Sequence, residues 1–156
     1  MTTRPPSVLF VCLGNICRSP LAEAALRARA GAARIDILID SAGTGDWHVG
    51  AAPDRRALAV ASRHGVDAST LRARQVDESD FRRFDRILAL DRNNLAALRA
   101  IAPADGTATI GLLLDLVPGR EGEDVHDPYQ GPPAAFEETW RDVSAAAKHI
   151  VRELSA

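Results

Sequence analysis

The sequence predicts an α/β fold with one parallel β-sheet covered by helices on both faces. Short apolar runs typical of buried strands alternate with segments of helical pattern, and this alternation implies right-handed βαβ units. The first apolar run also ends in a tight turn that leads directly into a helix, as at the carboxyl edge of many parallel sheets. Because 156 residues are enough for one hydrophobic core, we expect a single domain over residues 1–156.

The predicted strands are short, apolar and rich in β-branched residues, which suits a sheet buried on both faces. Residues 1–6 precede the first strand and are predicted to form a loose tail. We expect the four strands at residues 8–11, 35–39, 86–90 and 109–114.

The predicted helices follow the strands. The first, at residues 21–30, is rich in Ala, Leu and Arg and is expected to close at Gly31. The last carries an apolar stripe at helical spacing, which predicts that it packs on the sheet. The three later helices are expected at residues 53–64, 94–102 and 134–154, and the stripe is formed by Phe136, Trp140, Val143, Ala147, Ile150 and Leu154.

The composition excludes several classes of function. The net charge of −2 gives no electrostatic basis for binding nucleic acid, and no basic run indicates membrane binding. No apolar stretch approaches the ~20 residues of a membrane span, and the N-terminal residues show neither the apolar region nor the cleavage site of a signal peptide, so we expect none. The four histidines lack metal-ligand spacing, so we predict no metal and no cofactor. With only two cysteines, close together, we expect a reducing cytoplasm; nothing in the sequence indicates an oligomeric state.

The segment around which the chain is organised reads VLFVCLGNICRSPLAEAA, residues 8–25. A buried strand, a tight loop and a helix start aim loop amides and the positive helix end at one point, which makes a cradle for an anion. Cys12 and Arg18 bracket this cradle loop. A thiolate at its floor and a guanidinium at its rim are suited to bind a phosphate and attack its phosphorus.

The residues between them suit a tight turn. Gly14 permits a positive φ, and Asn15 tolerates the left-handed region while offering a side chain to brace the turn. Ser19 is predicted to cap the helix and to donate a hydrogen bond to the Cys12 sulfur, and Pro20 suits the first helical position.

The run Cys12-Leu13-Gly14-Asn15-Ile16-Cys17-Arg18-Ser19-Pro20 resembles the signature of the low-molecular-weight protein tyrosine phosphatases, and likewise lies near the N-terminus. The resemblance extends over nearly the whole chain. It implies a four-stranded sheet in the order 2-1-3-4. It also implies that the loop residues Leu13, Gly14, Asn15, Ile16 and Cys17, together with Ser19, bind phosphate or support the loop.

Two further segments supply candidate site residues. Expelling an aryloxide requires a proton donor, which the thiolate cradle lacks. Asp127-Pro128-Tyr129 resembles the family's general-acid loop, so Asp127 is the candidate donor. Trp47 and Tyr129 lie on loops near the strand ends and are predicted to form walls for a phenyl ring. Asp91, with Asn94, resembles another element that supports the cradle.

The chain departs from the family pattern at two positions. Many relatives carry a second tyrosine where Gln130 stands, so regulation through that tyrosine is not expected. Many also carry a histidine that braces the cradle asparagine, where this chain has Leu71 before Arg-Ala-Arg-Gln. We therefore expect Asn15 to be held by Ser19 and Ser41 instead.

These residues predict a phosphatase acting on phosphotyrosine-containing proteins through a phosphocysteine, with Cys12, Arg18 and Asp127 as catalytic residues. Three alternatives remain open. A thiol-linked arsenate reductase would use further cysteines, and none follows Cys17. A protein-arginine phosphatase tends to carry threonine where this chain has Ile16. The third is an idle phosphopeptide-binding module, against which the intact catalytic residues argue.

Overall fold

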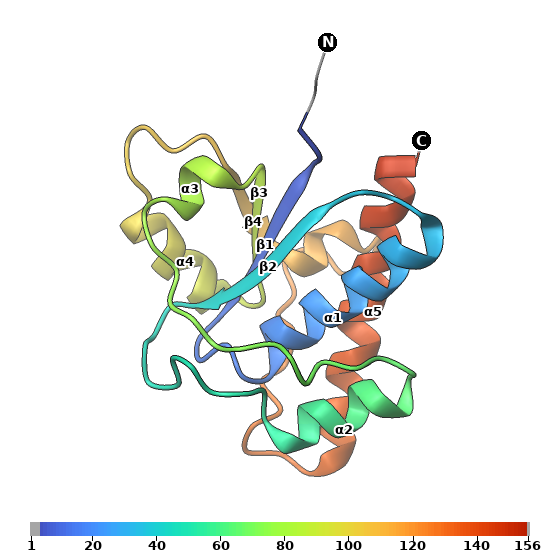
Figure 1. The fold of residues 1–156 in the computed structure, drawn as a ribbon. Coiled ribbons are helices and arrows are strands. Elements are labelled where there is room, and N and C mark those ends of the chain that lie inside the picture. Colours follow the sequence, from blue (N-terminus) through green and yellow to red (C-terminus); the bar gives the residue numbers. More distant parts are fainter. Residues whose placement is uncertain (1–3, 156) are drawn as a thin grey trace.

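Four strands form one parallel sheet in the order β2-β1-β3-β4 in the computed structural model, which describes residues 4–155 (Figure 1). The strands are β1 (Ser7–Cys12), β2 (Leu38–Gly43), β3 (Arg86–Ala89) and β4 (Thr109–Leu112). The predicted α/β class and the strand order are both confirmed. Because β1 pairs with β2 on one side and with β3 on the other, its carboxyl end lies in the middle of one sheet edge.

Helices cover both faces of this sheet (Figure 1). One face is covered by α1 (Arg18–Ala33), α2 (Arg55–Arg63), the 3-10 helix η1 (Leu113–Leu116) and α5 (Pro133–Ser155). The other face is covered by α3 (Asp80–Arg83) and α4 (Arg92–Ile101).

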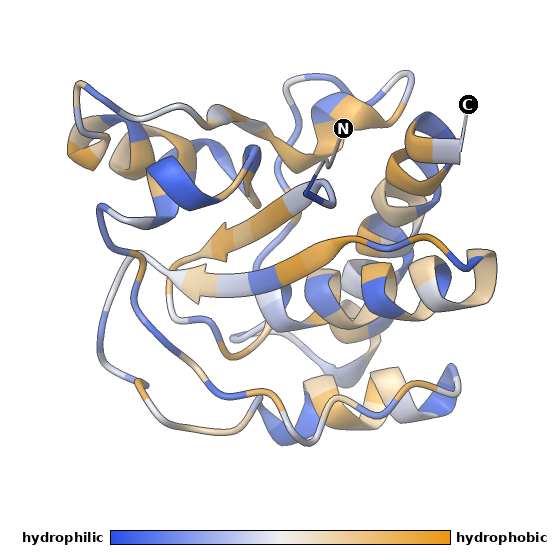
Figure 2. Cartoon of the chain, turned by 45° about the horizontal axis from the view of Figure 1, so that its top comes forward, coloured by the Kyte–Doolittle hydropathy of each residue, from blue (hydrophilic) through white to orange (hydrophobic). Residues whose placement is uncertain are grey.

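The two halves of the core meet at the central strand, because alternate side chains of a strand point to opposite faces. Val8 and Phe10 pack into the larger cluster, with α1, α2 and α5. Leu9 and Val11 pack into the smaller one. The strands are accordingly mostly hydrophobic, whereas the helices carry hydrophilic residues on their outer faces (Figure 2). The apolar stripe predicted on the last helix is buried in α5, with Leu154 at its partly buried end.

The first helix differs from the prediction, and the N-terminal segment is described only in part. Residues 1–3 of the expected tail lie outside the described residues; Arg4 is ion-paired with Asp85, and residues 4–6 belong to no helix or strand. Helix α1 runs through Gly31 and ends where Arg34 adopts a left-handed φ of 57°. There the Arg34 N–H bonds to the Gly31 carbonyl, so the chain closes the helix without a glycine at that position.

The second strand also lies further along the chain than predicted. Residues 41–43 look like the start of a loop, yet they belong to β2, where Gly43 pairs with Cys12. Glycine is needed at position 43 because the cradle loop passes close to it. A Cβ on Gly43 would lie 2.7 Å from the Leu13 carbonyl oxygen. The four-residue helix α3 was not predicted, because it is too short to show a helical period.

Candidate active site

The cradle loop joins the end of β1 to the start of α1, as predicted. Asn15 adopts a positive φ of 58°, which confirms the expected left-handed turn. Gly14 does not adopt a positive φ, so the conformational freedom that glycine permits is not used there. The space beside it is nevertheless tight, because a Cβ would lie 3.1 Å from Cδ2 of His48.

The Cys12 sulfur lies at the floor of the loop and is almost fully buried. It accepts a hydrogen bond from the Asn15 backbone N–H at 3.3 Å and lies 2.9 Å from Ser19 Oγ. Ser19 does not cap α1, contrary to the prediction, because Cys17 occupies the N-cap position. Pro20 is therefore the third helical residue, where its missing N–H removes no helical hydrogen bond. The Ser19 hydroxyl is therefore available to hydrogen-bond with the Cys12 sulfur.

The Asn15 side chain is the centre of a buried hydrogen-bond network. Its Nδ2 donates to Ser19 Oγ at 2.8 Å and to Ser41 Oγ at 2.9 Å, the two partners predicted from the sequence. Its Oδ1 accepts from the backbone N–H of Arg74 at 3.0 Å, a partner that no sequence signal indicates. Leu71, at the position of the family's histidine, packs instead against the larger hydrophobic cluster.

Arg18 is buried at the rim of the cradle and is held from two sides. Its Nη1 donates to Asp91 Oδ2 at 2.7 Å and to the Val125 carbonyl at 3.0 Å. Burial, the largest single effect, would lower the pKa of Arg18, but the hydrogen bond to Asp91 together with the charge interactions with Cys12, Asp91 and Asp127 outweighs it, so the pKa is raised. Asp91 also caps α4 through Asn94, so it fulfils both the capping and the supporting role.

Cys17, at the end of the cradle loop, is also buried. Burial, with the nearby carboxylate of Asp54, raises its pKa to about 12. Its side chain is thus a neutral thiol at physiological pH, and a thiol is a poor nucleophile. The nucleophilic role predicted for Cys12 therefore has no competitor in the loop.

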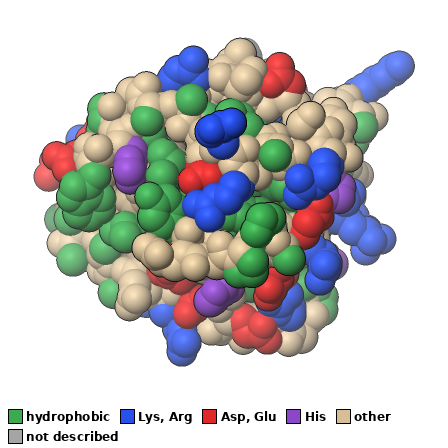
Figure 3. Space-filling view, turned by 90° about the horizontal axis from the view of Figure 1, so that it is seen from below, with side chains coloured by type: hydrophobic (Ala, Val, Ile, Leu, Met, Phe, Trp, Pro, Cys, Tyr) green, Lys and Arg blue, Asp and Glu red, His purple; other side chains and the backbone are tan. Residues whose placement is uncertain are grey.

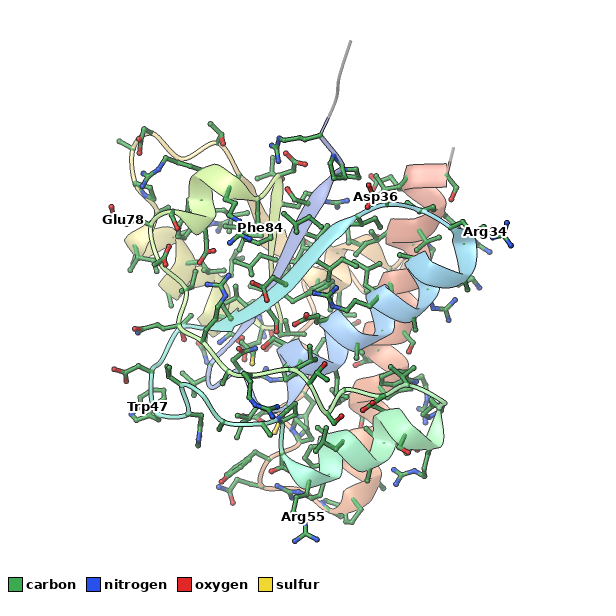
Figure 4. The ribbon with its side chains drawn as sticks, in the orientation of Figure 1. Arg34, Asp36, Trp47, Arg55, Glu78 and Phe84 are labelled. Atoms are coloured by element: carbon green, nitrogen blue, oxygen red, sulfur yellow. The ribbon has the colours of Figure 1, made fainter. Side chains whose placement is uncertain are left out.

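The remaining predicted residues reach the cradle from two other loops. Asp127 is half exposed, with its Oδ2 3.8 Å from Arg18 Nη2, and its Oδ1 accepts from the Tyr129 N–H at 3.1 Å. Trp47 lies at the outer edge of the molecule on the loop after β2 and is 69% exposed (Figure 4). Gln130 is exposed beside Tyr129.

These groups surround one cavity of about 180 Å3 at the carboxyl edge of the sheet. Hydrophobic side chains lie beside basic ones on the face that contains this edge (Figure 3). His48, which the sequence did not single out, joins the lining. The cavity is lined by Cys12, Leu13, Gly14, Ile16, Cys17, Arg18, Trp47, His48, Asp127 and Tyr129.

The groups that line this cavity suit only a few kinds of reaction. A sulfur, a charged guanidinium and a carboxyl group converge on a space with aromatic walls. The positive end of α1 faces the same space, and such helix ends bind phosphate groups. Among the described residues, no group of three potential metal ligands is present.

Comparison with known proteins identifies the family. Residues 7–156 match the family model described as low molecular weight phosphotyrosine protein phosphatase. The chain belongs to this family. A low molecular weight protein-tyrosine-phosphatase of Streptomyces coelicolor is 46% identical over 149 residues, which cover 92% of this chain and 90% of that protein.

Two solved structures show how closely the fold follows other phosphatases of this kind. The crystal structure of YfkJ from Bacillus subtilis superposes with a TM-score of 0.90 at 39% identity, covering 98% of this chain and 96% of that one. A Drosophila arginine phosphatase, DARP, has the same TM-score at 31% identity, covering 96% and 98%. None of the helices in the described part of this phosphatase chain could cross a membrane.

Proposed function

We propose that this protein hydrolyses phosphotyrosine in proteins through a phosphocysteine formed on Cys12. The observation that carries the proposal is the convergence of Cys12, Arg18 and Asp127 on one cavity rimmed by Trp47 and Tyr129. The first three groups suit phosphoryl transfer, and the two aromatic rings suit a phenyl leaving group.

In the proposed reaction the Cys12 thiolate attacks phosphorus, and the bond from phosphorus to the phenolic oxygen breaks. Arg18 and the loop amides bind the equatorial oxygens, where negative charge is held in the transition state. Leu13, Gly14, Asn15, Ile16 and Cys17 form the loop that presents these amides. Ser19 supports the sulfur, which it contacts at 2.9 Å.

Asp127 completes the cycle as general acid and then as general base. It donates a proton to the departing phenolate and afterwards takes one from the water that hydrolyses the phosphocysteine. Its position within 3.8 Å of Arg18 supports this role, because both groups then face the same phosphoryl group. The scheme uses no metal or cofactor.

We also propose a reducing compartment, the cytoplasm, for this reaction. Cys12 and Cys17 are both free thiols, and oxidation of Cys12 would remove the nucleophile.

A substrate panel tests the proposal. Purified protein is assayed with a phosphotyrosyl peptide, a phosphoarginyl peptide and arsenate plus thiol, with Cys12→Ser as the blank. We expect turnover of phosphotyrosine at least about tenfold above that of phosphoarginine, and none by the blank. The phosphoarginine arm is required because the arginine phosphatase DARP shares the fold. Preference for phosphoarginine, or arsenate reduction, would overturn the assignment.

A further inference from the structure

The segment after Asp127 has few connections to the rest of the protein. Before it, Val125 is anchored, because its N–H bonds to the Leu90 carbonyl at 2.8 Å and its own carbonyl accepts from Arg18. Two hydrogen bonds are local, from the Tyr129 N–H to Asp127 and from the Ala135 N–H to the Pro132 carbonyl; the other hydrogen bonds that join residues 128–132 to the rest of the described chain all come from Arg56. Arg56 thus fixes the downstream side of the loop.

The guanidinium of Arg56 contacts this loop through hydrogen bonds and through aromatic rings. Its Nη2 donates to the Tyr129 carbonyl at 3.0 Å and its Nη1 to the Gly131 carbonyl at 3.4 Å. The same group lies 4.6 Å from the centre of the Phe136 ring and 5.6 Å from that of Tyr129, within the range of cation–π attraction. A planar group with several donors is needed to make these contacts together.

Arg56 is itself held in place by Asp54, the N-cap of α2. Its Nε and Nη2 donate to the two carboxylate oxygens of Asp54, each at 3.1 Å. The hydrogen bond from Arg56 is the main reason why the pKa of Asp54 lies below its ordinary value, so this carboxylate stays charged. The Asp54 N–H in turn bonds to the Ile16 carbonyl at 2.8 Å. Through Asp54, then, Arg56 connects the cradle loop to the acid loop.

From this geometry we infer that Arg56 is a positioning residue, which holds the Asp127 carboxyl at the correct distance from the cradle. This inference rests on the proposed function, since it assumes that Asp127 is the general acid. Arg56 touches no reacting atom. Its removal is expected to leave phosphate binding by the cradle intact and to impair protonation of the leaving group.

The test compares Arg56→Gln with the matched control Arg55→Gln. Arg55 is the preceding residue of α2, and its side chain points away from the molecule (Figure 4). The kcat is measured with phosphotyrosine, a poor leaving group, and with 4-nitrophenyl phosphate, an activated one. We expect Arg56→Gln to lose about tenfold more kcat on phosphotyrosine than on the activated ester, within the range that general acid catalysis contributes. Inhibition by inorganic phosphate and all rates of Arg55→Gln should stay unchanged.

Two further variants make each outcome decisive. Arg56→Lys keeps the charge but cannot bridge two carbonyls and Asp54. Like Arg56→Gln, it should therefore lose more kcat on phosphotyrosine than on 4-nitrophenyl phosphate. It also replaces Arg56→Gln in the test if that variant does not fold. When Asp127 is already replaced by Ala, adding Arg56→Gln should not increase the difference in kcat loss between phosphotyrosine and 4-nitrophenyl phosphate. Equal losses on both substrates, or full activity of Arg56→Lys, would overturn the role of Arg56. If Asp127→Ala itself lost equally on both substrates, the proposed function of Asp127 would fail instead.

Discussion

At the scale of single residues, the two cysteines of the cradle loop differ in what surrounds them. Cys12 accepts a hydrogen bond from the Asn15 N–H and contacts Ser19, and both contacts suit a negatively charged sulfur. Cys17 is buried near the carboxylates of Asp54 and Asp127, and burial together with these charges raises its pKa, so it stays a thiol. Two identical side chains five positions apart thus have different hydrogen-bond partners and different charged neighbours.

Trp47 is an exposed residue, and its proposed role as a wall of the cavity depends on where its ring lies. Its ring lies against Gly45, since a Cβ on that glycine would lie 1.9 Å from Trp47 Cζ3. Any larger residue at position 45 would displace the ring. The ring is therefore held beside the cavity although 69% of the residue is exposed.

We predict that Trp47→Ala raises KM for aryl phosphates about two- to tenfold, because an aromatic pair contributes roughly 0.5–1.5 kcal/mol. Inhibition by inorganic phosphate should not change, since the cradle alone binds that anion. Steady-state kinetics measure both quantities. Val49→Ala, at another exposed residue of the same loop, is the control. A parallel weakening of phosphate inhibition would show that Trp47 packs the cradle and does not face the substrate.

At the scale of elements, the junction between α1 and β2 holds the cradle from behind. Glu23 is buried on α1, where its Oε1 accepts from Ser41 Oγ at 2.7 Å and its Oε2 pairs with Arg27 at 2.8 Å. Ser41 in turn accepts from Asn15. A chain of hydrogen bonds thus runs from a buried carboxyl group to the nucleophile's loop.

This junction predicts a pH dependence of stability. Burial raises the pKa of Glu23 above its ordinary value of 4.5, despite the hydrogen bonds from Ser41 and Arg27. Above that pH the unfolded chain releases the proton before the folded protein does. The free energy of unfolding therefore falls as pH rises from 4.5 to the folded pKa. Glu23→Gln cannot titrate, so this fall should be absent from it.

Urea unfolding at a series of pH values measures the difference between wild type and Glu23→Gln. We expect the wild type to lose stability relative to the variant as pH rises above 4.5. Glu138→Gln, at an exposed position of α5, is the control and should show no such trend. A difference that is constant or changes in the opposite direction would contradict the assignment.

At the scale of the whole molecule, the sequence predicts those parts of the site that rest on local pattern. The strand, loop and helix around Cys12 follow from residues that are neighbours in the chain. The predicted β2 boundary is wrong because residues 41–43 look like a loop in sequence, whereas Gly43 is required by the close approach of the cradle loop, a contact between distant segments. Two hydrogen bonds of the site, from the Arg74 backbone N–H to Asn15 and from the Arg56 side chain to the Tyr129 carbonyl, each join a side chain to a backbone atom. Because every residue has these backbone atoms, no pattern of side chains in the sequence could predict them.

The central claim is that Cys12 forms a covalent phosphocysteine, and trapping it is the most direct test. Asp127→Ala should form this species from 4-nitrophenyl phosphate but hydrolyse it slowly, because no base activates the water. A denaturing quench during turnover, followed by mass spectrometry of the peptides, should find one phosphoryl group on Cys12. The double variant with Cys12→Ser should carry none. Steady release of phosphate with Cys12 unmodified, or with the phosphoryl group on another residue, would contradict the mechanism.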